Sequence, residues 1–153
     1  MNNEIFREYD IRGNVERDLT DDVVLSIGRA FGSHMVKLGK KRASLCRDCR
    51  LSSEHYRDLL IEAMVESGLD VVDIGLAPTP LFYYSLFNLD VEGGIMVTGS
   101  HNPPYHEWFQ SCRRQVDYLW RTDTGLEEDH RVGKIRYRKR IMPRIQKHRQ
   151  RLS

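Results

Sequence analysis

The residues best suited to chemistry lie in one short segment, T-G-S-H-N-P-P at positions 98–104. The apolar run G-G-I-M-V precedes it, so a strand is expected to deliver Ser100 to the edge of a sheet. Gly99 permits a tight backbone approach, and Asn102 with the two prolines favours a turn after the serine. No G-x-S-x-G elbow surrounds Ser100, which argues against a hydrolase nucleophile. A serine that carries a phosphoryl group fits better, with cations and a metal to manage the charge. The alternative is an ordinary turn with a capping serine.

A second polar segment follows another apolar strand. Arg47, Asp48 and Arg50 come directly after residues 42–46. In α/β folds the working groups lie at the carboxyl ends of parallel strands, so this segment is expected beside the serine loop. A solvated ion pair is the alternative reading of these charges.

The cysteines do not indicate a metal or redox site. Cys46 and Cys49 have C-x-x-C spacing, but Cys112 is the only other cysteine and cannot complete a four-thiolate zinc site. We expect free thiols in a reducing compartment.

The elements that must position these loops alternate along the chain. Such alternation predicts an α/β fold, a three-layer α/β/α sandwich around a mostly parallel, mixed sheet. Apolar periodicity, turn residues and caps set the expected bounds. Helices are predicted from Thr20 to Gly39, from a cap at Ser52 or Ser53 to Gly68, and over 81–89, and strands over 42–46, 70–74 and 93–97.

Bulk properties describe one domain with an unusual end. The chain has 153 residues, with 40% hydrophobic and 30% charged residues. It has no apolar run of the ~20 residues that a membrane span needs and no recognisable signal peptide, so we expect a cytoplasmic protein. Residues 1–104 contain 11 Lys/Arg and 16 Asp/Glu, a net charge of −5, whereas residues 105–153 contain 13 and 6, a net charge of +7. Beyond Pro104 the periodicity is lost, which predicts an irregular, poorly ordered basic tail over 105–153.

Four segments stand in order along the first hundred residues: F-R-E-Y-D-I-R-G at 6–13, R-D-C-R-L-S at 47–52, P-T-P at 78–80 and T-G-S-H-N-P-P at 98–104. Together they resemble the α-D-phosphohexomutase family, specifically its bacterial phosphomannomutase/phosphoglucomutase branch. The resemblance implies that residues 1–104 are an incomplete first domain, the one that carries the phosphoserine loop.

The resemblance implies a role for each matching residue. Ser100 corresponds to the family's phosphoserine, whose phosphate also binds Mg²⁺, and Arg12 to an electrostatic or acid–base contributor. Phosphoryl transfer between the 6- and 1-positions of hexose phosphates would pass through a bisphosphate intermediate, with a hexose 1,6-bisphosphate as activator. Substrate contact is implied for Tyr9, His101 and Asn102, with packing or a local turn as the alternative, and bracing of the serine loop for Arg47, Asp48 and Arg50.

The resemblance breaks after Pro104. The family continues with two residues and then N-G-F-K, whose lysine is a proposed acid–base group, whereas E-W-F-Q stands here at 107–110. Gln110 thus replaces the lysine and Trp108 the glycine. Codons for E-W-F-Q exist that give N-G-F-K when read one base later, and 116–122 and 130–140 also allow family-like readings. We infer a one-base frameshift near codons 104–106, with a divergent family variant as the alternative.

The expected function is therefore that of a mutase fragment, inactive alone. The chain lacks the D-G-D-x-D-R and G-E-x-S-G-H loops by which the family holds Mg²⁺ and recognises the sugar. Phosphoglucosamine mutase is the alternative within the family. A nucleic-acid-binding protein or phosphoprotein that uses the basic tail is the alternative of another class, although we expect no specific nucleic acid and no membrane as partners. We also expect a marginally stable, aggregation-prone chain with exposed apolar surface.

Overall fold

The computed structural model describes residues 3–6, 10–102 and 105–113. Five strands form one sheet in the order β1-β5-β4-β2-β3. β2 runs parallel to β3 and β4, whereas β5 runs antiparallel to β4 and β1. The elements are a 3₁₀ turn η1 (Asn3–Ile5), β1 (Ile11–Asn14), α1 (Asp21–Lys37), β2 (Arg42–Arg47), α2 (Leu51–Glu66), β3 (Asp70–Leu76), α3 (Thr79–Asn88), β4 (Gly93–Thr98) and β5 (His106–Arg113).

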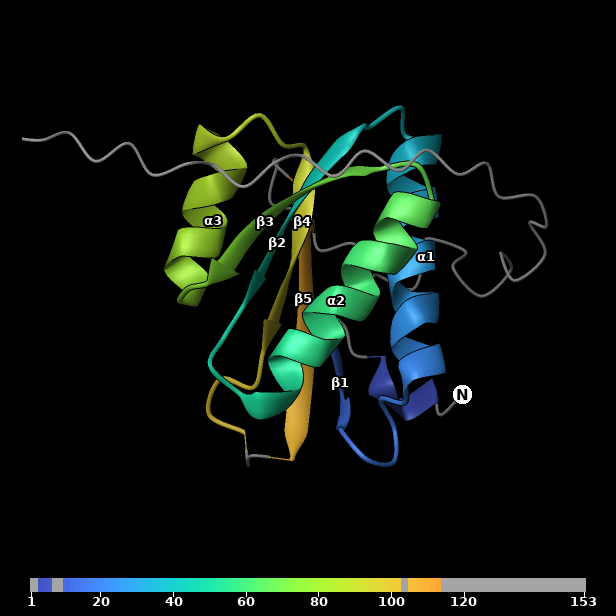
Figure 1. The fold of residues 1–153 in the computed structure, drawn as a ribbon, viewed down its shortest axis with the longest axis vertical. Helices are drawn as coiled ribbons and strands as arrows, with labels where there is room; N and C mark the ends of the chain where they lie inside the picture. Colours follow the sequence, from blue (N-terminus) through green and yellow to red (C-terminus); the bar gives the residue numbers. More distant parts are fainter. Residues whose placement is uncertain (1–2, 7–9, 103–104, 114–153) are drawn as a thin grey trace, which may run out of the picture.

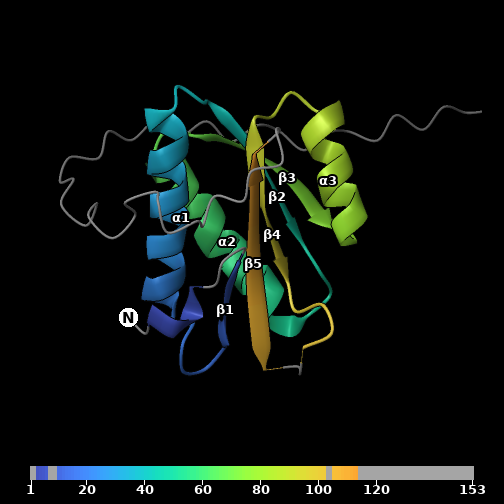
Figure 2. The same ribbon diagram turned by 180° about the vertical axis from the view of Figure 1, so that it is seen from behind.

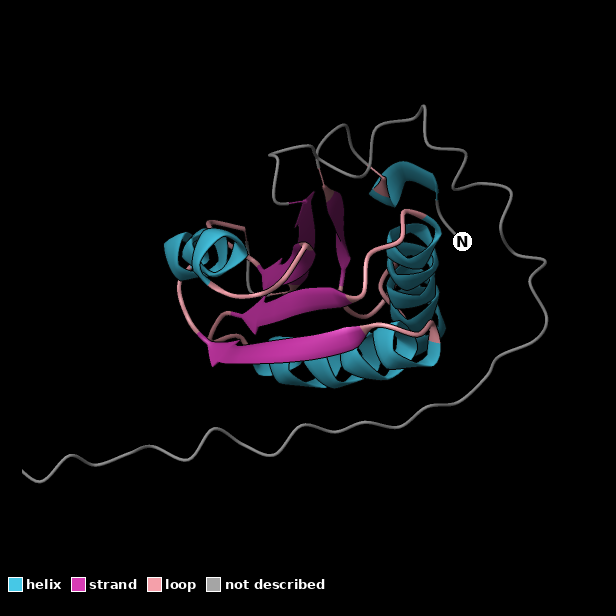
Figure 3. Ribbon diagram, turned by 90° about the horizontal axis from the view of Figure 1, so that it is seen from above, coloured by secondary structure: helices cyan, strands magenta, loops and turns pink. Residues whose placement is uncertain are grey.

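The sheet lies between two helical layers, so the predicted α/β/α sandwich with a mixed sheet is confirmed (Figures 1 and 2). Alternate strand residues face opposite layers. Leu45, Ile95 and Phe109 pack into the main core beneath α1 and α2. Cys46 and Met96 belong to a smaller core on the other face, beneath α3. Seen from above, α3 stands on the side of the sheet opposite α1 and α2 (Figure 3).

Helices α1 and α2 approach each other closely because small residues line their contact. A Cβ placed on Gly28 would lie 2.7 Å from the Cβ of Ala63, and one on Gly32 would lie 2.5 Å from the Cβ of Ser67. These separations are below normal van der Waals contact, so the glycines are required for this packing. No helix in the described part of the chain is both long enough and apolar enough to cross a bilayer.

Strand β5 corrects the predicted end of the domain. The sequence analysis ended the domain at residue 104 and expected irregular structure beyond it, which is wrong for 106–113. This segment pairs with two neighbours and lies inside the sheet. Its pattern was obscured because, of the buried side chains described in it, Glu107 and Ser111 are polar and Phe109 is apolar. The remainder of the expected tail, residues 114–153, lies outside the described residues.

The predicted serine cap of α2 is also wrong. The helix begins at Leu51, with Arg50 at the N-cap position and no side-chain cap hydrogen bond. The hydroxyls of Ser52 and Ser53 bond to carboxyl groups elsewhere in the domain. Thr20 occupies the expected N-cap of α1 but its side chain makes no cap hydrogen bond.

Candidate functional site

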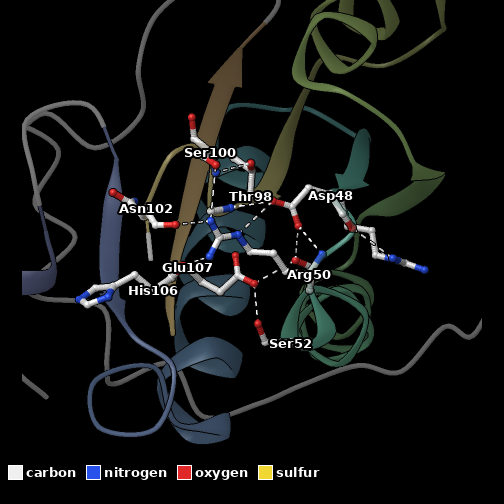
Figure 4. A network of polar contacts seen from close by, with 11 residues as sticks. Asp48, Arg50, Ser52, Thr98, Ser100, Asn102, His106 and Glu107 are labelled. Carbon is white, nitrogen blue, oxygen red and sulfur yellow. Dashed lines mark hydrogen bonds and ion pairs between the residues drawn. The ribbon is translucent and has the colours of Figure 1, made fainter. Parts of the chain in front are cut away.

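The two polar segments meet because β2 and β4 are parallel neighbours. The register pairs Arg47 with Val97, so both strands deliver their following loops to the same edge of the sheet. The Asp48 amide donates to the Val97 carbonyl at 2.9 Å, which extends the pairing into the loops. Figure 4 shows the polar network that results.

Asp48 anchors the serine loop through its carboxylate. Its Oδ2 accepts from the Gly99 amide at 2.7 Å, and its Oδ1 accepts from the Arg50 amide at 3.0 Å and the Ser53 hydroxyl at 2.6 Å. Burial tends to raise the pKa of Asp48, but these hydrogen bonds and one from Thr98 outweigh it and hold the pKa below its usual value. Asp48 is therefore a charged acceptor that fixes the backbone just before Ser100.

Arg50 holds the same loop from the opposite side. Its Nη2 donates to the Asn102 carbonyl at 2.6 Å and lies 3.5 Å from the Ser100 carbonyl, and its Nη1 donates to the His106 carbonyl at 3.1 Å. A Cβ built on Gly99 would overlap the Arg50 guanidinium. Glycine is thus required at position 99 so that the guanidinium can lie against the backbone.

Ser100 itself is exposed, with its side chain directed away from the Asp48–Arg50 network (Figure 4). Its φ of +46° lies in the left-handed region, an uncommon conformation for a residue other than glycine. The Ser100 amide donates to Thr98 Oγ1 at 3.0 Å, and the Asn102 amide donates to the Gly99 carbonyl at 2.8 Å. The loop therefore presents a hydroxyl to solvent on a backbone that is held in place.

The other predicted site residues are placed differently. His101 is exposed beside Ser100, and Asn102 contacts Gly99 and Arg50 through its main chain. Arg47 donates to the Asp48 carbonyl at 3.1 Å and pairs with Glu54 at 3.5 Å, so it contacts the Asp48 backbone and not the serine loop. Tyr9 lies outside the described residues.

Arg12 belongs to strand β1, where it faces Trp108 of β5. Its Nε and Nη2 each donate to an Asp10 carboxylate oxygen at 2.8 Å, and its guanidinium carbon lies 4.0 Å from the centre of the Trp108 ring. The hydrogen bonds to Asp10 raise the pKa of Arg12. The structure thus places this arginine in a strand, between a carboxylate and an aromatic ring.

Sequence reasoning missed one residue of the network. Glu107 of β5 is 0% exposed, and its Oε1 accepts from the Ser52 and Ser53 hydroxyls at 2.6 and 2.9 Å. Burial raises the pKa of this carboxyl, and the nearby Asp48 charge raises it further. No sequence signal identified it, because the segment was interpreted as an out-of-frame tail.

The described residues do not offer Mg²⁺ a protein site of their own. No group of three or more His, Cys, Asp or Glu side chains converges among them in a way that suits a metal. The Asp48 oxygens already face N–H and O–H donors. A cation at this edge would depend on the phosphate of a modified Ser100 and on ligands beyond the described residues.

Comparison with protein-family models identifies the family of this domain. The model for "Phosphoglucomutase/phosphomannomutase, alpha/beta/alpha domain I" matches residues 3–116, which includes all five strands. The chain belongs to the phosphoglucomutase/phosphomannomutase family. The family match thus extends through β5, past the predicted boundary at residue 104.

Phosphoglucomutase/phosphomannomutase relatives are similar over the same region. A phosphomannomutase/phosphoglucomutase of Pseudomonas aeruginosa is 43% identical over 106 residues, 69% of this chain and 23% of its own. A phosphomannomutase of Salmonella typhimurium is 38% identical over 128 residues, 84% of this chain and 27% of its own. The crystal structure of a family protein from Burkholderia thailandensis superimposes with a TM-score of 0.68 at 41% identity, over 72% of this chain and 26% of that one. The chain therefore spans about a quarter of the length of these relatives.

Proposed function

We propose that Ser100 is a phosphoryl carrier for hexose phosphates, as in a mutase that transfers phosphate between the 6- and 1-positions. The observation that carries this proposal is the exposed Ser100 hydroxyl on a left-handed backbone that Asp48 and Arg50 hold from two sides. A rigidly presented nucleophile lowers the entropic cost of reaching an in-line phosphoryl donor. His101 and Asn102 would flank the bound substrate, and Arg12 would add positive charge from β1.

We further propose that the chain completes only part of the cycle. A full mutase must bind both ends of the sugar bisphosphate and balance the charge of the transferring group. The domain supplies the carrier serine, whereas the Mg²⁺ ligands and sugar contacts of the family correspond to motifs absent from this sequence. Phosphorylation of Ser100 without net sugar isomerisation is the expected behaviour.

The test separates these two steps. The full chain is incubated with Mg²⁺ and glucose 1,6-bisphosphate, or its mannose counterpart, and its intact mass and peptide fragments are measured. We expect one phosphate on Ser100, none in Ser100→Ala, and no conversion of hexose 1-phosphate in a coupled assay. Failure of Ser100 to gain phosphate would overturn the carrier proposal. Sugar turnover above the Ser100→Ala blank would overturn the proposed incompleteness.

The frameshift near codons 104–106 also stands as a proposal, and β5 adds an argument for it. Seven buried side-chain polar atoms in the described residues have no hydrogen-bond partner, and four of them are in β5: His106 Nδ1, Glu107 Oε2, Trp108 Nε1 and Ser111 Oγ. Native strands seldom leave such groups unsatisfied. Backbone pairing needs no particular side chain, so a strand forms even where its residues suit the position poorly. The gene's nucleotide sequence, read in three frames, tests this directly.

A further inference from the structure

The buried carboxyl of Glu107 sits below the serine loop and has too few donors for a charged group. Among the described residues, its Oε1 meets the hydroxyls of Ser52 and Ser53, and its Oε2 has no hydrogen-bond partner. Figure 4 shows Glu107 beside Ser52. An ionised carboxylate in such a place is strongly disfavoured unless it is paired and fully hydrogen-bonded. The surroundings of Glu107 therefore disfavour the charged form of its carboxyl.

If Asp48 and Glu107 are both ionised, too few hydrogens are present to fill the short oxygen–oxygen contacts of Ser53. Ser53 Oγ lies 2.6 Å from Asp48 Oδ1 and 2.9 Å from Glu107 Oε1. A hydroxyl carries one hydrogen and donates one full hydrogen bond. If both carboxyls were ionised, one of these two short oxygen–oxygen contacts would have no hydrogen in it. One of the two carboxyls must hold the proton.

The surroundings place that proton on Glu107. Asp48 receives two backbone N–H groups besides the Ser53 hydroxyl, and its Oδ2 lies 3.6 Å from Arg50 Nε, all of which favour the charged form. The ionisable groups that face Glu107 are Asp48 and Arg50 from the loop after β2, and Tyr56 from α2. Arg50 favours ionisation of Glu107, but its guanidinium donates to the carbonyls of Ser100, Asn102 and His106. Burial and the Asp48 charge oppose ionisation of Glu107.

We propose that Glu107, rather than Asp48, holds the shared proton and that its hydrogen bond through Ser53 to Asp48 positions the loop that carries Ser100. In this arrangement Glu107 donates to Ser53, Ser53 donates to Asp48, and Asp48 accepts from the Gly99 amide. Ser52 donates to Glu107 Oε1, which accounts for every short contact. Glu107 is thus a positioning residue, linked through two side chains to the backbone next to Ser100. The proposal concerns how the loop is held and does not depend on whether Ser100 accepts a phosphoryl group.

Deprotonation of Glu107 should loosen this chain of contacts. The folded-state pKa is raised above the ordinary value, so the stabilisation is complete below about pH 4 and is lost as pH rises through the folded pKa. The Gly99 amide should sense the same transition, since Asp48 must re-orient or lose the Ser53 hydrogen. A purely structural role for Glu107 would not couple its titration to that amide.

The test follows both groups by NMR in the full chain. The ¹³C carboxyl shift of Glu107 and the ¹H–¹⁵N shifts of Gly99 and Ser100 are recorded across the pH range. We expect a Glu107 midpoint raised above the ordinary glutamate value of about 4.3 and the same midpoint at Gly99. In Ser53→Ala, Glu107 should still titrate with a raised midpoint while the Gly99 transition disappears. A Glu107 midpoint that is not raised would overturn the proposal, as would a Gly99 amide that does not follow Glu107.

A second variant keeps the test decisive if Ser53→Ala does not fold. Glu107→Gln retains the shape and supplies N–H donors at every pH, so its melting temperature should not fall with rising pH as that of the parent chain does. Glu62→Gln, at an exposed position of the same helix that carries Ser53, is the matched control and should keep the parent's dependence. An unchanged pH dependence in Glu107→Gln would count against the proposal.

Discussion

At the residue scale, the loop depends on one carboxylate that serves several donors at once. Asp48 accepts from Gly99, Arg50 and Ser53, and it is only 20% exposed. The Gly99 amide cannot turn to water without disturbing the backbone next to Ser100. A change at Asp48 should therefore affect the loop before it affects the core.

We predict that Asp48→Asn lowers the free energy of unfolding at pH 7 by about 1–3 kcal/mol, because an amide nitrogen cannot accept these hydrogen bonds. The folded pKa of Asp48 is lowered, so its contribution is present above the unfolded value of about 4 and is lost as pH falls through the folded pKa. Urea unfolding from pH 2 to 7 measures this. The gap between parent and variant should narrow in acid, and a constant gap would contradict the assignment.

The chemical residues were easier to predict than their contacts. The glycine, serine and prolines of 98–104 indicate their own turn, and the R-D-C-R segment follows an apolar strand, so both loops were expected at one edge of the sheet. The partners of Ser52, Ser53 and Arg12 depend on β1 and β5, two strands that the sequence did not predict. Side-chain contacts across the sheet depend on register, which local patterns do not encode when the inward residues are polar.

At the element scale, helix propensity and close packing have opposite effects at the contact between α1 and α2. Alanine in place of glycine normally favours a helix by about 0.5–1 kcal/mol. At Gly28 and Gly32 the added Cβ would lie 2.7 Å from the Cβ of Ala63 in α2 and 2.5 Å from the Cβ of Ser67 at the C-cap of α2, so the helices would have to move apart.

We predict that Gly28→Ala and Gly32→Ala each destabilise the domain by about 1–3 kcal/mol, the usual cost of overpacking. Thermal and urea unfolding give the sign of the change. The comparison variant is Gly39→Ala, where no atom lies within 4 Å but φ is +72°, so that any loss there comes from backbone strain. Stabilisation by either α1 variant would show that the helices are less closely packed than described.

Two buried serines, Ser111 of β5 and Ser53 of α2, have opposite expected effects. Both are 0% exposed, but Ser111 Oγ has no hydrogen-bond partner among the described residues, whereas Ser53 Oγ contacts two carboxyls. Removing a buried hydroxyl that has no hydrogen-bond partner removes the cost of its desolvation. Removing a bonded hydroxyl leaves its partners unsatisfied.

We predict that Ser111→Ala stabilises the chain by about 1 kcal/mol and that Ser53→Ala destabilises it by about 1–3 kcal/mol. Chemical unfolding of both variants at pH 6 measures the two changes side by side. Loss of stability in Ser111→Ala would indicate that its hydroxyl has a partner, and would weaken the argument that the residues of β5 suit their positions poorly.

At the scale of the whole molecule, the two faces of the sheet differ in how completely helices cover them. The α1–α2 layer has two helices and the larger core, whereas the opposite face carries α3 alone among the described elements (Figure 3). The α3 sequence T-P-L-F-Y-Y-S-L-F-N contains no charged residue. Its outward side chains Leu81, Tyr84 and Phe87 are 44%, 60% and 55% exposed, and they recur at three-residue spacing along one side of the helix.

An uncharged apolar face of this kind promotes association in a chain that spans about a quarter of its relatives. We predict that the full chain sediments with a concentration-dependent average mass and that Tyr84→Lys with Phe87→Glu shifts it toward the monomer without changing the melting temperature by more than a few degrees. The two substitutions add opposite charges, so the net charge is preserved and any effect comes from lost apolar contact. The control is Glu62→Lys with Lys37→Glu, at exposed positions of α2 and α1, which also preserves the net charge. If association persists in the α3 variant, the surface responsible lies elsewhere. Raising the salt concentration would then test whether the basic residues 114–153 cause it.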